Sequence, residues 1–142
     1  MSYRTVMTVA EIEAFLDAEF PEMHLGGKVF FVETVAPGAI TMRFRADHRH
    51  LRPGGTISGP AQFALADIAA FVAVLAHAGP VGLAVTTNAN INFLKKPPPG
   101  DLIATTRVLK LGRRLVVIDC AISGADDPAI VSHAVATYSL PG

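Results

Sequence analysis

The sequence contains one cysteine and no tryptophan, and charged residues make up only 17% of its 142 positions. The single cysteine, Cys120, excludes an intrachain disulfide and provides no paired metal-ligand spacing. Because Cys120 lies in an alternating apolar segment, we expect a buried thiol in a protein of a reducing compartment, the cytoplasm. With 51% apolar residues, the chain has too few charged residues to cover the surface of a monomer with polar groups. We therefore expect interfaces between subunits.

The charge pattern and the apolar runs argue against nucleic-acid and membrane partners. Twelve basic and twelve acidic residues cancel, and no stripe of Lys and Arg with interleaved aromatic residues occurs. The N-terminal stretch is amphipathic and carries Glu11 and Glu13, unlike a signal peptide. The longest apolar run, residues 63–78, is shorter than the roughly 20 residues that span a bilayer, and Asp67 within it would be costly at membrane depth. We therefore interpret this run as a helix buried in a protein core.

Hydrophobic periodicity predicts a single α+β domain over residues 1–142. A capping box from Thr8 to Glu11 begins a short amphipathic helix, and a long helix over about 60–78 is apolar around nearly its whole circumference. Strand-like segments accompany the helices at residues 28–36, 39–46, 81–94, 102–111, 114–123 and 129–140. An antiparallel sheet of five or six strands that curls around the long helix would bury part of it, and a second copy of the protein would cover the rest.

The long helix carries one acid, Asp67, in apolar surroundings. The positions one helical turn away on the same face are Phe63, Ala64, Ala70 and Phe71. A carboxylate so placed is costly unless a cation or several hydrogen-bond donors meet it, and such acids concentrate at functional sites. We therefore favour a functional Asp67 over an acid that caps a helix or points to solvent.

The start of the same helix is a second candidate feature. Gly59 before Pro60 places backbone N–H groups and the positive end of the helix dipole beside a residue that lets a ligand approach, which suits a developing oxyanion. An ordinary helix cap is the alternative. Gly59 and Asp67 are eight residues apart, about 12 Å along the axis, too far to contact the same carbonyl group. If both serve one reaction, Asp67 acts on a substrate held by the Gly59 of another subunit, and catalysis requires a dimer.

The segments GTISGPAQFALAD and NINFLKKPPPGDLIATTRVLKLGRR are similar to hotdog-fold acyl-CoA thioesterases of the phenylacetate-pathway (PaaI-like) type, and the similarity covers roughly residues 25–140. In that family a loop of the form N-x-x-G-x-x-H-G-G leads into a central helix that carries L-A-D. Gly59 matches the first glycine of H-G-G and Asp67 matches the acid. The resemblance implies a hotdog fold in which Asp67 attacks the thioester carbonyl or activates a water across a dimer interface, while the Gly59 amide holds the oxyanion.

Three positions of the loop differ from the family pattern. Arg52 stands where the family has Asn, Ser58 where it has His, and Pro60, which lacks an N–H, where it has the second glycine. Arg52 near the Asp67 of a partner would stabilise the carboxylate and make it a poorer base. Ser58 can still donate a hydrogen bond but cannot carry a proton as His does. We expect Asp67, Gly59, Ser58 and Arg52 to form the catalytic set.

Substrate binding is expected at Pro60, Asn88, Lys95, Arg113 and Arg114. The three basic residues lie in turns at the ends of strands, where the resemblance suggests that they meet the phosphates of coenzyme A; solvated turn residues are the alternative. Asn88 begins a polar row that lies either on an outer sheet face or near an acyl pocket. Apart from coenzyme A as part of the substrate, we expect neither a metal ion nor another cofactor.

Two further candidate sites are less consistent with the sequence. The segment GTISGP is not the G-x-S-x-G turn of serine hydrolases, and no histidine has a spacing that ties it to Ser58 as a nucleophile. His48 and His50, two apart in a loop, could bind a metal ion or act as a base, but solvated loop histidines are commoner.

Hydrolysis of an acyl-CoA thioester by a homodimer, which pairs again into a tetramer, is the function that these features favour. The alternative is a non-catalytic protein that binds or senses acyl-CoA with the same pocket. A hotdog hydratase or dehydratase is disfavoured, because it would need a histidine where this chain has Ser58.

Overall fold

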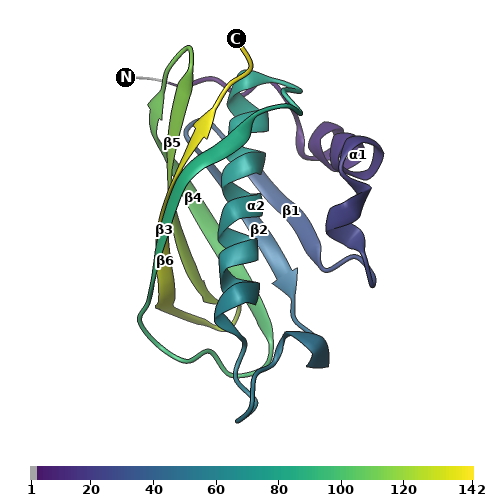
Figure 1. The fold of residues 1–142 in the computed structure, drawn as a ribbon, viewed down its shortest axis with the longest axis vertical. Coiled ribbons are helices and arrows are strands. Elements are labelled where there is room, and N and C mark those ends of the chain that lie inside the picture. Colours follow the sequence, from purple (N-terminus) through teal and green to yellow (C-terminus); the bar gives the residue numbers. More distant parts are fainter. Residues whose placement is uncertain (1–2) are drawn as a thin grey trace.

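The computed structural model describes residues 3–142, which form a six-stranded antiparallel sheet curled around one long helix (Figure 1). The elements in chain order are α1 (Val9–Glu19), η1 (Pro21–His24), β1 (Phe30–Ala36), β2 (Ala39–Arg45), η2 (His48–His50), α2 (Gly59–Ala78), β3 (Val85–Phe93), β4 (Asp101–Leu111), β5 (Leu115–Gly124) and β6 (Asp127–Ser139). The strands lie in the order β1-β2-β4-β5-β6-β3, so β1 and β3 form the two edges. The predicted α+β class and the sheet wrapped around a central helix are confirmed.

Helix α2 begins one residue earlier than predicted and ends at the predicted residue. Its N-cap is Ser58, whose Oγ accepts a hydrogen bond from the Ala61 N–H at 3.2 Å, and Gly79 ends it with a positive φ of 98°. By length and composition the helix could cross a membrane, but 67% of its most apolar window is buried inside the fold. This is the burial expected of a core helix.

Small side chains on α2 let the sheet approach closely. Ala69, Ala70, Ala73 and Ala76 are completely buried. Strands β4 and β5 fill the facing layer of the core from alternating positions, with Leu102, Ala104, Thr106, Val108, Val116, Ile118, Cys120 and Ile122. Each large aliphatic side chain buried in this layer contributes about 1.5–3 kcal/mol to the free energy of unfolding.

A buried histidine ties the end of α2 to the turn between β1 and β2. The Gly38 N–H donates to His77 Nε2 at 2.8 Å, and His77 Nδ1 lies 2.8 Å from the carbonyl oxygen of Ala73. Both contacts are hydrogen bonds only when the imidazole is neutral with its proton on Nδ1. His77 therefore acts as a polar link inside the core.

Helix α1 lies beside α2 on the side of β1, away from β3 (Figure 1). The predicted capping box is present: Thr8 N–H donates to Glu11 at 2.9 Å, and Glu11 N–H donates to Thr8 Oγ1 at 3.2 Å. Ile12 and Leu16 are buried against the core and hold the helix in place. The remaining face of α1 forms one wall of a pocket next to α2.

The reactivity of Cys120 tests this core. The side chain is 2% exposed, and burial, reinforced by the charge of Asp119, raises the pKa of the thiol to about 12. Because only the thiolate reacts, we expect the native protein at pH 8 to react with a thiol reagent at least about a hundredfold more slowly than the unfolded protein. The measurement is the rate of thiol labelling with and without guanidinium chloride. Equal rates would contradict a buried Cys120.

Candidate functional site

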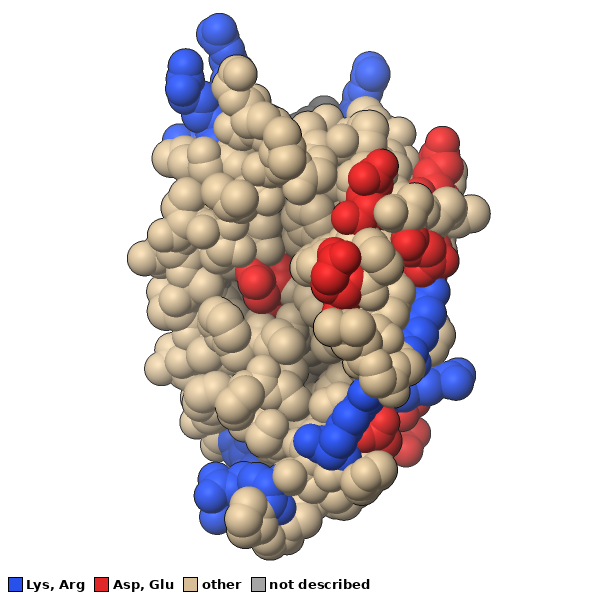
Figure 2. Space-filling model, turned by 45° about the vertical axis from the view of Figure 1, so that its right-hand side comes forward, with Lys and Arg blue, Asp and Glu red and all other residues tan. Residues whose placement is uncertain are grey.

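A pocket of about 730 Å³ lies between α1 and α2. Its walls come from α1, η1, β1, α2, the start of β3 and the end of β6, and much of its lining is aromatic, with Phe15, Phe20, Phe30 and Phe71. Figure 2 shows this face of the molecule hollowed beside the lobe that α1 forms, with acidic side chains at the hollow. The pocket is therefore apolar in its walls and open at its mouth.

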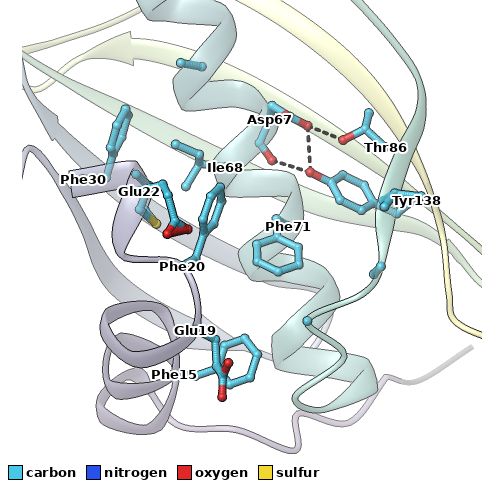
Figure 3. Close-up of a pocket in the computed structure, with 15 residues that line it drawn as sticks. Phe15, Glu19, Phe20, Glu22, Phe30, Asp67, Ile68, Phe71, Thr86 and Tyr138 are labelled. Carbon is cyan, nitrogen blue, oxygen red and sulfur yellow. Dashed lines mark hydrogen bonds between the residues drawn. The ribbon is translucent and has the colours of Figure 1, made fainter. Parts of the chain in front are cut away.

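Asp67 faces this pocket from the middle of α2 (Figure 3). Thr86 Oγ1 donates a hydrogen bond to Asp67 Oδ1 at 2.8 Å, and the Tyr138 hydroxyl lies 2.7 Å from the same oxygen. The hydroxyl also lies 3.0 Å from the Asp67 carbonyl oxygen, but its single proton favours the charged acceptor. Within residues 3–142, nothing donates to Asp67 Oδ2. One carboxylate oxygen is thus fixed and the other is free to react.

The Tyr138 hydroxyl is suited to hold a carboxylate. Burial raises the pKa of Tyr138 above its ordinary value, and the neighbouring charge of Asp67 raises it further. The phenol therefore stays protonated and keeps donating over the whole range in which a protein is usually assayed. A carboxylate in apolar surroundings needs either a cation or hydrogen-bond donors beside it. Asp67 has neutral hydrogen-bond donors.

Thr86 and Tyr138 were not among the residues expected from the sequence. They face each other in the β3–β6 register, where Thr86 pairs with Tyr138 but Asn88 pairs with Thr137, because a bulge intervenes between Thr86 and Asn88. In a regular strand, Thr86 and Asn88 would point to the same face. The bulge turns Thr86 inward, toward Asp67, and leaves Asn88 exposed and outside the pocket lining. The polar row of Asn88 thus lies on the outer sheet face, one of the two placements that its pattern allowed.

The start of α2 has a free backbone donor. No acceptor for the Gly59 N–H occurs among the described residues, and Pro60 has no N–H. Ser58 Oγ accepts the capping hydrogen bond, so its own O–H proton remains available to donate. Gly59 also has a packing role, because a Cβ there would lie 3.2 Å from the Phe93 ring. The structure thus offers both a donor and an ordinary structural reason for this glycine.

The other expected residues are divided between the two ends of the molecule. Arg52 lies in an exposed turn next to the start of α2, and Lys95 follows β3 at that same end, 3.9 Å from Asp127. Arg113 and Arg114 lie in the β4–β5 turn at the opposite end (Figure 1). One copy of the chain therefore does not bring these basic side chains together.

Of the two loop histidines, His48 is exposed and only His50 has structural partners. His50 Nδ1 accepts the Asp47 N–H at 2.9 Å, its ring packs against Phe44, and burial lowers its pKa. A pair not expected from the sequence, His133 and Asp119, lies on the outer face of the sheet with Nε2 and Oδ1 2.5 Å apart. In the part of the chain that the structure describes, no three His, Cys, Asp or Glu side chains are grouped to hold a metal ion.

A carboxylate with one free oxygen beside an apolar pocket can act as a base or nucleophile toward a carbonyl group. A free N–H at a helix start can stabilise the oxyanion that forms. In one chain these groups are about 12 Å apart along α2, because eight residues separate them. The base or nucleophile and the oxyanion donor are both present, but within a single chain they are too far apart to act on the same carbonyl group.

Known proteins with the same architecture include several thioesterases. The family model of the Thioesterase superfamily matches residues 54–130. A candidate thioesterase from Silicibacter sp. TM1040 is 42% identical over 98% of this chain and 95% of its own, with a TM-score of 0.86. The E. coli PaaI protein from the phenylacetic acid degradation operon is 21% identical over 92% of this chain and 90% of its own, with a TM-score of 0.74. A Streptococcus mutans protein bound to acetyl-CoA is 22% identical over 81% of this chain and 90% of its own, with a TM-score of 0.71. A comparison with the curated proteins finds no significant match.

The two more distant neighbours show that the fold is shared. The family match covers more than half of the 142 residues, and the Silicibacter relative is similar along nearly its whole length. The resemblance noted in the sequence is thereby confirmed, and the chain belongs to the thioesterase superfamily, with its hotdog fold.

Proposed function

We propose that the protein is a cytoplasmic acyl-CoA thioesterase whose active site is shared between two subunits. The observation that carries this proposal is the Asp67 carboxylate, fixed through Oδ1 by Thr86 and Tyr138 while Oδ2 is left without a donor at an apolar pocket. The acetyl-CoA bound by the Streptococcus mutans neighbour supports coenzyme A as the thiol part of the substrate. The proposed chemistry requires neither a metal ion nor a redox cofactor.

A dimer supplies the geometry that one chain lacks. Strand β3 is an edge of the sheet, and Phe63, Val85 and Phe93 on α2 and β3 are 38%, 57% and 53% exposed. Pairing of two β3 edges would cover these apolar groups and bring two α2 helices together. The Asp67 of one subunit would then approach the Gly59 of the other. We propose that such dimers associate further into tetramers.

In the proposed reaction, the Gly59 N–H of one subunit polarises the thioester carbonyl. Asp67 Oδ2 of the other subunit either takes a proton from the attacking water or attacks the carbonyl carbon itself. In both routes the C–S bond breaks, the thiol leaves with a proton, and water supplies the second oxygen of the acid. Ser58 and Arg52, at the start of α2, would position the substrate or the water.

The proposed phosphate contacts follow the same arrangement. Arg52, Lys95 and Pro60 are exposed at the end of the molecule where α2 begins with Gly59. Arg113 and Arg114, at the opposite end, would reach the same coenzyme only from the partner subunit. Asn88, on the outer face, has no place in this reaction.

Substitution of Asp67 tests the catalytic role. Asp67→Asn keeps the shape of the side chain but removes the base or nucleophile, so we expect kcat to fall at least about a hundredfold. Thiol release from short, medium, long and aromatic acyl-CoA substrates measures the loss, and Asp126→Asn is the matched control in an exposed turn. If the wild type binds acyl-CoA but releases no thiol, the non-catalytic alternative holds.

Tyr138→Phe tests whether the hydroxyl positions the carboxylate. Removing one donor to a charged acceptor should lower kcat about tenfold with little change in KM. The loss should be the same from pH 7 to pH 9.5, because burial raises the pKa of Tyr138 and keeps it protonated there. Tyr3→Phe is the control, since Tyr3 packs against His77 outside the pocket. Equal losses in both variants would contradict a positioning role.

Mixed subunits test the shared site. Gly59→Pro removes the N–H at the first position of α2, where a helix tolerates proline; its Cβ would lie 3.2 Å from the Phe93 ring, which is 53% exposed and has room to shift. Asp67→Asn removes the acid. Each variant alone should be inactive, whereas unfolding and refolding an equimolar mixture should restore about a quarter of wild-type activity, because half of the random dimers carry one intact site. No recovery in refolded mixed dimers would place both groups in one subunit.

A further inference from the structure

The pocket at Asp67 is acidic as well as apolar. Two more carboxylates line it, those of Glu19 at the end of α1 and Glu22 in η1, and no Lys, Arg or His is among its lining residues. In Figure 3 both glutamates lie on the α1–η1 wall, across from the wall that carries Asp67. A ligand between the two walls therefore has the Asp67 carboxylate on one side and the two glutamates on the other.

The charges of Glu19 and Glu22 are not compensated within residues 3–142. Neither residue forms a salt bridge, although basic groups occur nearby: Lys28 is taken up by Glu13, at 2.9 Å, and by Asp17, at 3.7 Å. His24 also contacts Asp17. Lys28 and His24 are therefore engaged by the other acids of this lobe, and no salt bridge offsets the two pocket glutamates among the described residues.

The position of this acidic wall is fixed by packing. Phe20, which directly follows Glu19, contacts Phe71 edge-on with ring centres 6.2 Å apart, and Phe71 stacks on Tyr138 at 6.0 Å. These rings form a continuous aromatic wall from the donor that holds Asp67 to the segment that carries Glu19 and Glu22. An acyl group that lies along this wall ends near the glutamates.

From this arrangement we infer that the pocket admits acyl groups whose far end is neutral or cationic and rejects acyl groups that end in a carboxylate. The inference rests on the proposed function, because it assigns the pocket to the acyl part of the thioester. Both glutamates are exposed and partly screened by water, but beside the low-dielectric walls of an apolar cleft two like charges still repel a third anion more strongly than in open water. Rejection of a like charge is a common way to exclude a competing substrate.

A matched pair of substrates tests the inference. Hexanoyl-CoA and adipoyl-CoA have the same chain length and differ in the terminal carboxylate. The wild type should prefer hexanoyl-CoA in kcat/KM, and Glu19→Gln with Glu22→Gln should narrow that preference by roughly tenfold, chiefly by raising kcat/KM for adipoyl-CoA. High salt should narrow the wild-type preference in the same direction.

The control variant changes net charge equally but away from the pocket. Glu33→Gln with Asp126→Asn removes two exposed acids that do not line it. The inference would be overturned if the preference for hexanoyl-CoA over adipoyl-CoA is unchanged in the Glu19→Gln, Glu22→Gln variant, or if it changes equally in the control variant.

Failure of the proposed function has a different signature. If no acyl-CoA is hydrolysed, calorimetry with the thioether analogues S-hexyl-CoA and S-(5-carboxypentyl)-CoA still measures charge selection. The inference is supported if the wild type binds the hexyl analogue more tightly and the ratio of the two dissociation constants narrows about tenfold in the Glu19→Gln, Glu22→Gln variant. It is overturned if this ratio narrows equally in the control variant, or in neither variant.

Discussion

The hydrogen bonds from Thr86 and Tyr138 to one oxygen of Asp67 are the interaction on which the site depends. A carboxylate in the middle of an apolar helix is costly unless donors meet it. Here two neutral hydroxyls meet it, at 2.8 and 2.7 Å, and a cation is not needed. Because both donors use Oδ1, the other oxygen stays available for chemistry. The same contacts that make the acid tolerable therefore also orient it.

Those donors reach Asp67 only because of how the sheet surrounds α2. The sheet covers one side of the helix and α1 stands beside another, so the space left between them becomes the pocket. Its glutamates come from α1 and η1, its aromatic wall from Phe20, α2 and β6, and its donors from β3 and β6. The acid, the apolar wall and the negative rim thus belong to separate parts of the chain that one packing arrangement brings together.

Much of this arrangement could be predicted from local patterns. The capping box of Thr8, the long apolar helix and the strand segments follow from spacing alone, and Asp67 stood out because its neighbours on the helix are apolar. Thr86 and Tyr138 could not be predicted, since they are 52 residues apart in the sequence and meet only through strand pairing. Arg113 and Lys95 were both expected near coenzyme A. They lie at opposite ends of the folded molecule, because the turns that carry them are at opposite ends of the sheet.

The sequence by itself determined the order of helices and strands, the buried course of α2 and the presence of an acid within it, because periodicity and turn residues act over a few neighbours. The tertiary structure decided which side chains meet that acid. A one-residue bulge in β3 turns Thr86 inward and leaves Asn88 outside, and the docking of α1 sets Glu19 and Glu22 across from Asp67. Such choices depend on strand register and on packing between distant segments, which no local pattern encodes.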